Sequence, residues 1–265
     1  MKRVPVGSES FAVQDEGRGA PVLLVHGFPL DHTMWAAQVA ALSPRHRVIA
    51  PDLRGFGASV VTSGTVTMAR MADDLAALLD ALGVSEPVTY VGFSMGGYVG
   101  WPFLRSQRRR VARLVLCDTR AVADTAEAAK GRLAMADKVE AEGAGVAAEA
   151  MLGKLLAPGR AERDPDLARR VRDVILKTDP RGIAAAQRGM AERTDARADL
   201  PLLGLPTLVI VGEHDAISTR GEMSALAAEV PGARLVEVPG AGHTTPMEDP
   251  AAVNAALLDF LAAAR

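Results

Sequence analysis

Short runs of apolar residues alternate along this chain with longer segments whose apolar residues recur every three to four positions. The runs predict strands at 21–25, 47–50, 87–93, 111–117, 207–212 and 233–238. The periodic segments predict helices from about residue 33, over 67–82 and 219–230, and over 249–263 at the end of the chain. Strands this uniformly apolar are typical of a sheet that helices cover on both faces. We therefore expect an α/β fold with a mostly parallel, doubly wound central sheet, preceded by an edge hairpin within residues 3–14.

The alternation stops in the middle of the chain. Helices are expected at about 121–142, 145–156, 165–177 and 180–193, with no strand between them. The segment contains no aromatic residue, and it leaves the sheet after one strand and returns at the next. We expect residues 1–118 and 206–265 to form the core and residues 119–205 to form an inserted all-helical cap, or lid, over the strand ends.

Composition narrows the class of protein. Apolar residues make up 49% of the 265 positions and charged residues 23%, which is ordinary for a folded globular protein. The net charge of −2 shows no basic surface for nucleic acid or an anionic membrane. The single cysteine, Cys117, lies in a predicted strand and cannot form an intrachain disulfide. No signal peptide or membrane-spanning run is visible, so we expect a cytoplasmic protein without a metal or other cofactor.

Polar residues gather where the predicted strands end. His26, Asp52, Ser94, Asp118 and Asp215 each follow one of the apolar runs directly or within a few residues. Because the carboxyl ends of parallel strands meet at one edge of a sheet, these side chains should lie near one another. Ligands of such sheets bind beyond that edge.

Ser94 stands in the sequence Gly92–Phe93–Ser94–Met95–Gly96, between a predicted strand and a predicted helix. Glycines two positions before and after the serine let strand and helix approach closely, so that the serine projects at the tip of the turn. Free N–H groups at the start of the helix suit an oxyanion there. This pattern indicates a nucleophilic serine.

A serine nucleophile needs a base, and the base needs a carboxylate that orients it. His243 lies in a glycine-rich loop after the last strand, which is the right edge of the sheet. Asp215 follows strand 207–212 and gives the order Ser, Asp, His; Asp118, one strand earlier, is the rival acid. The backbone N–H groups of Phe28 and Met95 are the expected oxyanion donors.

Five motifs occur in order: residues 26–29 (His-Gly-Phe-Pro), 52–59 (Asp-Leu-Arg-Gly-Phe-Gly-Ala-Ser), 92–97, 212–215 and 242–243. Together they resemble the α/β-hydrolase superfamily over essentially the whole chain. Within it, Ser94 excludes the aspartate nucleophile of epoxide hydrolases and dehalogenases and the cysteine of dienelactone hydrolases. The chain is similar to bacterial carboxylesterases and enol-lactonases, and the runs 116–119 and 231–235 favour that side.

The resemblance implies a serine hydrolase that cleaves a carboxylic ester of a small, largely apolar substrate through an acyl-enzyme. Three other enzymatic functions would use the same triad: a lactonase, a C–C bond hydrolase or a perhydrolase. The non-enzymatic alternative is a ligand receptor on a hydrolase fold. Homo-oligomerisation stays open. Apolar side chains from core and cap are candidates for the substrate pocket: Trp35, Phe93, Trp101, Met135, Met151 and Met190.

Overall fold

The sheet runs through the centre of the molecule, in a computed structural model that describes residues 1–263. Its strands are β1 (Lys2–Val6), β2 (Glu9–Glu16), β3 (Pro21–Val25), β4 (Arg47–Pro51), β5 (Val88–Phe93), β6 (Val111–Cys117), β7 (Thr207–Gly212) and β8 (Arg234–Val238). They lie side by side in the order β1-β2-β4-β3-β5-β6-β7-β8. Strand β2 pairs antiparallel with both neighbours, and all the other pairs are parallel. The predicted fold class is confirmed.

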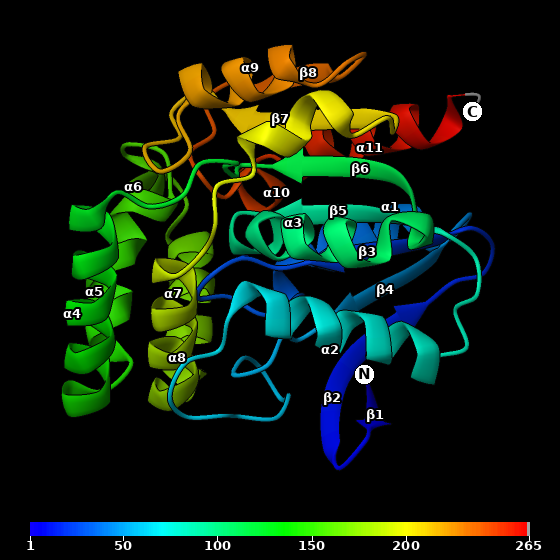
Figure 1. The fold of residues 1–265 in the computed structure, drawn as a ribbon. Helices are drawn as coiled ribbons and strands as arrows, with labels where there is room; N and C mark the ends of the chain where they lie inside the picture. The colour runs from blue at the N-terminus through cyan, green and yellow to red at the C-terminus, as the bar shows by residue number, and fades with distance from the viewer. Residues whose placement is uncertain (264–265) are drawn as a thin grey trace.

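Helices cover both faces of this sheet (Figure 1). Helices α2 (Met68–Ala81) and α3 (Met95–Gln107) lie on the near face, and α1 (Ala36–Leu42) and α11 (Pro250–Ala262) lie behind the sheet. Helix α9 (Arg220–Glu229) packs on β7 and β8. Every residue of β3, β5 and β7 is buried, which explains their continuous apolar sequences.

Between β6 and β7 the chain forms the cap. Its helices are α4 (Ala126–Glu142), α5 (Gly145–Leu155), α6 (Arg160–Arg163), α7 (Pro165–Lys177) and α8 (Pro180–Ala191), followed by the 3₁₀ helix η3 (Arg197–Leu202). They stand beyond the carboxyl ends of the strands (Figure 1). The first helix starts five residues later than predicted, because the Thr125 hydroxyl accepts a hydrogen bond from the Ala128 amide and caps α4 there.

Two further details differ from the predicted elements. The helix expected from residue 33 begins as a 3₁₀ turn, η1 (His32–Trp35), which the Asp31 carboxylate caps. A short additional helix, α10 (Thr245–Glu248), precedes α11. None of the helices described within residues 1–263 combines the length and hydropathy needed to cross a bilayer.

A buried ion cluster fastens the loop after β4 to the hairpin and to α2. The guanidinium of Arg54 is 1% exposed and contacts both oxygens of Asp74 at 2.7 Å. It also binds the carboxylate of Glu9 on β2 through Nη1, at 2.7 Å, and Nη2. These two carboxylates raise the pKa of Arg54 far above its usual range. A charge this deeply buried requires both partners.

Replacing Asp74 with alanine should therefore destabilise the fold by about 3 kcal/mol, since it leaves part of a buried guanidinium unpaired. Asp73→Ala is the matched control, because Asp73 is exposed on the same helix, and its effect should stay within about 0.5 kcal/mol. Urea unfolding of the three proteins measures the difference. Equal midpoints for the two variants would show that the cluster does not stabilise the fold.

Candidate active site

Three side chains from three loops form one hydrogen-bonded line at the carboxyl edge of the sheet. Ser94 Oγ lies 2.9 Å from His243 Nε2, and His243 Nδ1 lies 2.8 Å from Asp215 Oδ2. Ser94 is 6% exposed, Asp215 5% and His243 1%. A neutral imidazole that donates its Nδ1–H to the carboxylate leaves Nε2 free to accept the serine proton. The arrangement suits nucleophilic attack by the serine.

The turn that carries Ser94 has an unfavourable backbone conformation. Ser94 has φ +49°, in the left-handed region that a residue with a Cβ seldom adopts. A Cβ on Gly96 would collide with the backbone carbonyl groups of Val25 and His26, so only glycine fits where α3 passes β3. The Tyr90 hydroxyl holds the turn by donating to the Gly96 carbonyl at 2.7 Å.

The loop after β3 passes directly beside the serine. A Cβ on Gly27 would lie 2.9 Å from the Ser94 Cβ, which shows how closely the two backbones approach. His26 is fully buried and its Nε2 accepts a hydrogen bond from the Leu53 amide at 2.9 Å, so it joins two loops, in keeping with a loop-shaping role. Phe28 follows in this loop, and Met95 is the first residue of α3.

The loop of Asp215 is shaped by its own carboxylate. Oδ1 accepts hydrogen bonds from the Ile217 amide at 2.7 Å and the Ser218 amide at 2.9 Å, which leaves Oδ2 facing His243. Hydrogen bonds therefore hold both carboxylate oxygens of Asp215 in place.

Asp118, the rival acid, has other partners. Its Oδ1 accepts from the Gly212 amide at 3.0 Å, and its Oδ2 accepts from the Thr245 hydroxyl, so it bonds to the loops of Asp215 and His243 without bonding to the imidazole. Burial, and then the nearby charge of Asp215, raise the pKa of Asp118 well above its usual value.

Glu248 braces the histidine loop, a role that the sequence did not suggest. It is 4% exposed, and its Oε1 accepts from the Gly242 amide at 3.0 Å and the Thr244 hydroxyl at 3.1 Å. Oε2 accepts from the Ala157 amide of the cap at 2.9 Å. The sequence offered one indication of this role: an acidic residue, Glu248, stands five positions after the loop histidine His243.

One cluster has the donor types for a metal ion. Among residues 1–263, Asp31, His32 and Asp52 bring three ligand atoms within 4.8 Å of one another. Asp52 is already engaged, because Oδ1 accepts from the His32 amide at 2.9 Å and Oδ2 accepts from the Ala58 amide at 2.9 Å. The Asp52 carboxylate, by its contact with the imidazole, raises the pKa of His32. These bonds are consistent with a structural role for Asp52 in its loop.

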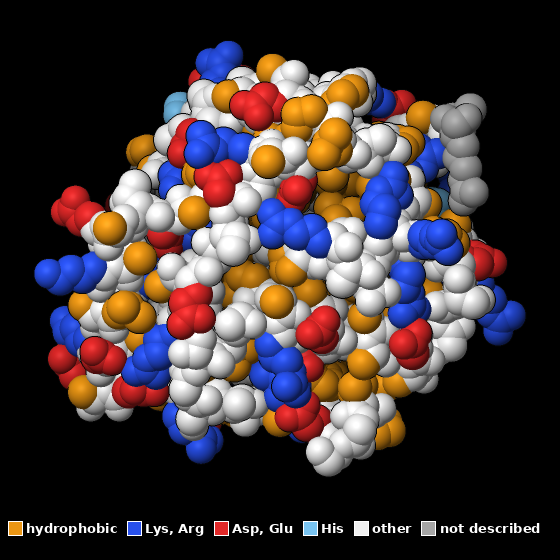
Figure 2. Space-filling view, in the orientation of Figure 1, with side chains coloured by type: hydrophobic (Ala, Val, Ile, Leu, Met, Phe, Trp, Pro, Cys, Tyr) orange, Lys and Arg blue, Asp and Glu red, His pale blue; other side chains and the backbone are white. Residues whose placement is uncertain are grey.

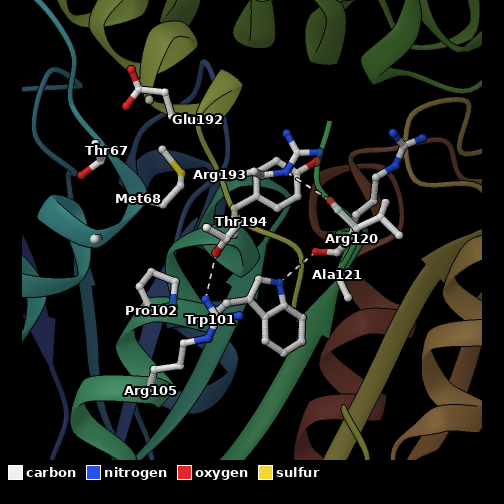
Figure 3. Close-up of a pocket in the computed structure, with 14 residues that line it drawn as sticks. Thr67, Met68, Trp101, Pro102, Arg105, Arg120, Ala121, Glu192, Arg193 and Thr194 are labelled. Atoms are coloured by element: carbon white, nitrogen blue, oxygen red, sulfur yellow. Dashed lines mark hydrogen bonds between the residues drawn. The ribbon is translucent and has the colours of Figure 1, made fainter. Parts of the chain in front are cut away.

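The apolar pocket candidates lie in different places. The Phe93 ring packs against the His243 imidazole, with 5.1 Å between centroids, and Trp35 meets Phe93 edge-on at 6.3 Å. Met135, Met151 and Met190 come from α4, α5 and α8 of the cap. Trp101, one turn beyond Tyr98 on α3, lines a cavity whose lining does not include Ser94, Asp215 or His243 (Figure 3).

A sequence model described as the alpha/beta hydrolase fold matches residues 20–250 of this chain. The chain belongs to the alpha/beta hydrolase family. A thermophilic esterase from Thermogutta terrifontis, solved with malate bound, superimposes on this hydrolase with a TM-score of 0.95 and 46% identity, over 98% of this chain and 97% of that one.

Two other comparisons relate the hydrolase to lactonases. The enol-lactonase of Burkholderia xenovorans LB400 has a TM-score of 0.91 and 31% identity, over 99% of this chain and all of that one. The 3-oxoadipate enol-lactonase 2 of Acinetobacter baylyi is 29% identical over 225 residues, covering 85% of this chain and 82% of its own. The resemblance inferred from the motifs is thereby confirmed at the level of the family.

The raised pKa of Asp118 predicts how this hydrolase responds to pH. A carboxyl whose pKa is raised on folding adds stability below its unfolded value of about 3.8, and that contribution is lost as pH rises through the folded pKa. Asp118→Asn, which stays neutral, should therefore gain stability relative to the native protein as pH rises from about 4 to about 8. Urea unfolding at several pH values tests this. Parallel stability curves for the two proteins would contradict it.

Proposed function

We propose that the protein hydrolyses carboxylic esters through an acyl-enzyme on Ser94. The observation that carries the proposal is the hydrogen-bonded line from Ser94 through His243 to Asp215. His243 Nε2 takes the Ser94 proton as Oγ attacks the ester carbonyl carbon, and the imidazolium then protonates the departing alkoxide. Water, activated by the same nitrogen, releases the acid and restores the serine.

Asp215 holds the imidazole in the required tautomer and stabilises the imidazolium that forms. The backbone N–H groups of Phe28 and Met95 bind the oxyanion, because the Phe28 loop passes beside Ser94 and the Met95 amide is the first of α3. The α3 N-terminus adds the positive end of its dipole. We expect the substrates to be small and largely apolar, since the Phe93 ring packs against His243.

Lactone hydrolysis is the second candidate, favoured by the 31% identity to an enol-lactonase over nearly the whole chain. The chemistry is the same, except that the leaving alkoxide stays attached to the acyl group. C–C bond cleavage would need a substrate whose leaving group is a carbon atom, perhydrolysis would use hydrogen peroxide in place of water on the acyl-enzyme, and a ligand receptor would show no turnover. Rates on matched aryl esters and lactones of equal carbon number distinguish ester from lactone hydrolysis, and the absence of turnover on both would favour a receptor.

Ser94→Ala should reduce hydrolysis of 4-nitrophenyl acetate or butyrate by at least about 10³-fold, because the nucleophile is lost. Ser106→Ala is the matched control on the same helix, where the hydroxyl is exposed and only bonds to the Pro102 carbonyl. It should keep full activity. Release of 4-nitrophenolate is the measurement, and unchanged activity in Ser94→Ala would end the proposal.

The two acids should differ sharply in turnover. Asp215→Asn should lower kcat by about 10³–10⁴-fold, because the amide favours the wrong imidazole tautomer. Asp118→Asn should lower kcat by less than about tenfold, since the asparagine still accepts from Gly212 and can donate to Thr245. The same aryl ester assay measures both. A large loss confined to Asp118→Asn would transfer the role of the acid to Asp118.

A further inference from the structure

Glu248 is an acidic side chain buried between the cap and the loop that carries His243. Acidic side chains are scattered over the surface on the face of the molecule seen in Figure 2, whereas Glu248 is only 4% exposed. Moving a carboxylate out of water is costly unless hydrogen-bond donors replace the water. The donors that surround Glu248 therefore indicate what its burial achieves.

The carboxylate joins the cap to the histidine loop, residues 239–244. Oε1 accepts from the Gly242 amide at 3.0 Å, and Oε2 accepts from the Ala157 amide at 2.9 Å. Gly242 directly precedes His243, and Ala157 lies in the link between α5 and α6. Arg160 of α6 also donates from Nη2 to the Glu248 carbonyl. The residue before His243 is thus tied to the cap through one side chain.

The residue after His243 is bonded to the same part of the cap. The Thr244 amide donates to the Leu155 carbonyl at 3.0 Å. The Thr244 hydroxyl lies 3.0 Å from that carbonyl oxygen and 3.1 Å from Glu248 Oε1. A Cβ on Gly242 would lie 2.4 Å from the Ala157 nitrogen, so the two backbones are in direct contact. Both neighbours of His243 in the sequence therefore rest on the α5–α6 link.

These contacts require a carboxylate, because the two backbone amides approach different oxygens. A carboxylate accepts at both oxygens, whereas glutamine has one acceptor oxygen and one NH₂ donor group. A glutamine of the same shape could accept from Gly242 or from Ala157, but not from both. The remaining buried N–H would face a second donor and lose its hydrogen bond.

His243 is the triad member whose position depends most on a loop. Ser94 directly follows β5, and Asp215 is held by amides of its own turn, whereas His243 stands in the histidine loop five residues beyond β8. Its ring must nevertheless meet Ser94 Oγ at 2.9 Å and Asp215 Oδ2 at 2.8 Å. Proton transfer is sensitive to such distances.

We propose that Glu248 is a positioning residue for His243, acting through the amides of Gly242 and Ala157. The inference rests on the proposed function, in which His243 Nε2 exchanges a proton with Ser94. Glu248 acts through the loop, since its carboxylate bonds to two backbone amides and a hydroxyl. The α5–α6 link of the cap thereby takes part in turnover.

Glu248→Gln should lower kcat for 4-nitrophenyl butyrate by about 10- to 100-fold, because the imidazole is no longer held in line with the serine. KM should stay within about threefold of the native value, since the base serves both acylation and deacylation. Rates are measured well below the unfolding temperature, with urea unfolding as the check that the protein is folded. A residue that only stabilises the fold would lower the urea midpoint and leave kcat unchanged.

Two further variants sharpen this test. Glu248→Asp keeps both acceptor oxygens, but it is one methylene shorter and cannot reach Gly242 and Ala157 together, so its kcat should fall at least about tenfold. Glu213→Gln is the matched control, because Glu213 is exposed and accepts from the Gly240 amide of the same loop at 2.9 Å. Its kcat should stay within about twofold of the native value.

Nitrogen NMR of the histidine rings observes the positioning without turnover. The native His243 should be the Nδ1–H tautomer, because Nδ1 faces the Asp215 carboxylate. In Glu248→Gln, at about pH 9 where imidazoles are neutral, its ring signals should shift towards the other tautomer, since the ring spends time away from Asp215. The chain has five histidines, and the loss of one set of signals in His243→Gln assigns this ring.

Two results would overturn the proposal. One is a folded Glu248→Gln protein whose kcat lies within about threefold of the native value, and the other is a lower kcat with unchanged His243 ring signals. Should Glu248→Gln fail to fold, Glu248→Asp decides by the same measurements. If the native protein hydrolysed no ester, the proposed function would fail, and the ring signals alone would decide whether Glu248 positions His243.

Discussion

The close approach of β5, α3 and β3 at Ser94 is the constraint on which the candidate active site depends. A serine at positive φ costs about 1–3 kcal/mol, and it persists only where its surroundings allow no other conformation. Here the Ser94 amide donates to the Cys117 carbonyl at 2.9 Å, and the Thr119 hydroxyl donates to the Ser94 carbonyl at 2.7 Å. Both partners lie at the end of β6, so the neighbouring strand sets the direction of the serine.

The histidine is held by a different set of contacts. Glu248 bonds to the backbone on the near side of His243 and to the Thr244 hydroxyl beyond it, and the Thr244 amide donates to the Leu155 carbonyl at 3.0 Å. The cap therefore does more than cover the strand ends, because its α5–α6 link is bonded to the loop that carries His243. Asp118 likewise joins two loops, because it accepts hydrogen bonds from the Gly212 amide, just before Asp215, and from the Thr245 hydroxyl, just after His243.

Much of this site follows from patterns that are local in the sequence. Apolar runs predict the buried strands, and residues just past the strand ends must meet at one edge, so Ser94, Asp215 and His243 could be named together. In the structure the His243 imidazole bonds to Asp215, the acid on the later strand, which is the acid that the sequence analysis favoured over Asp118. Asp118 keeps the backbone and hydroxyl partners that its position between two loops provides.

Contacts between distant residues were beyond prediction. Glu248 and Ala157 are 91 positions apart, and no periodicity connects them. The direction in which Trp101 points from α3 could not be predicted either. Residues 95–101 are all buried, and a helix that is buried on every side has no apolar stripe from which its orientation could be inferred. The start of α4 was missed since an apolar pattern continues through the loop that precedes Thr125.

The bond between Glu248 and Ala157 also couples one end of the cap mechanically to the histidine loop. Near α5 and α6 the cap cannot lift without pulling on the histidine loop. Helix α4 packs along α8, buries Ala136 and Val139 there, and is joined to it further by the ion pairs of Arg188 with Asp137 and Glu140. Any displacement of the link between α5 and α6 is therefore transmitted to the loop that carries His243.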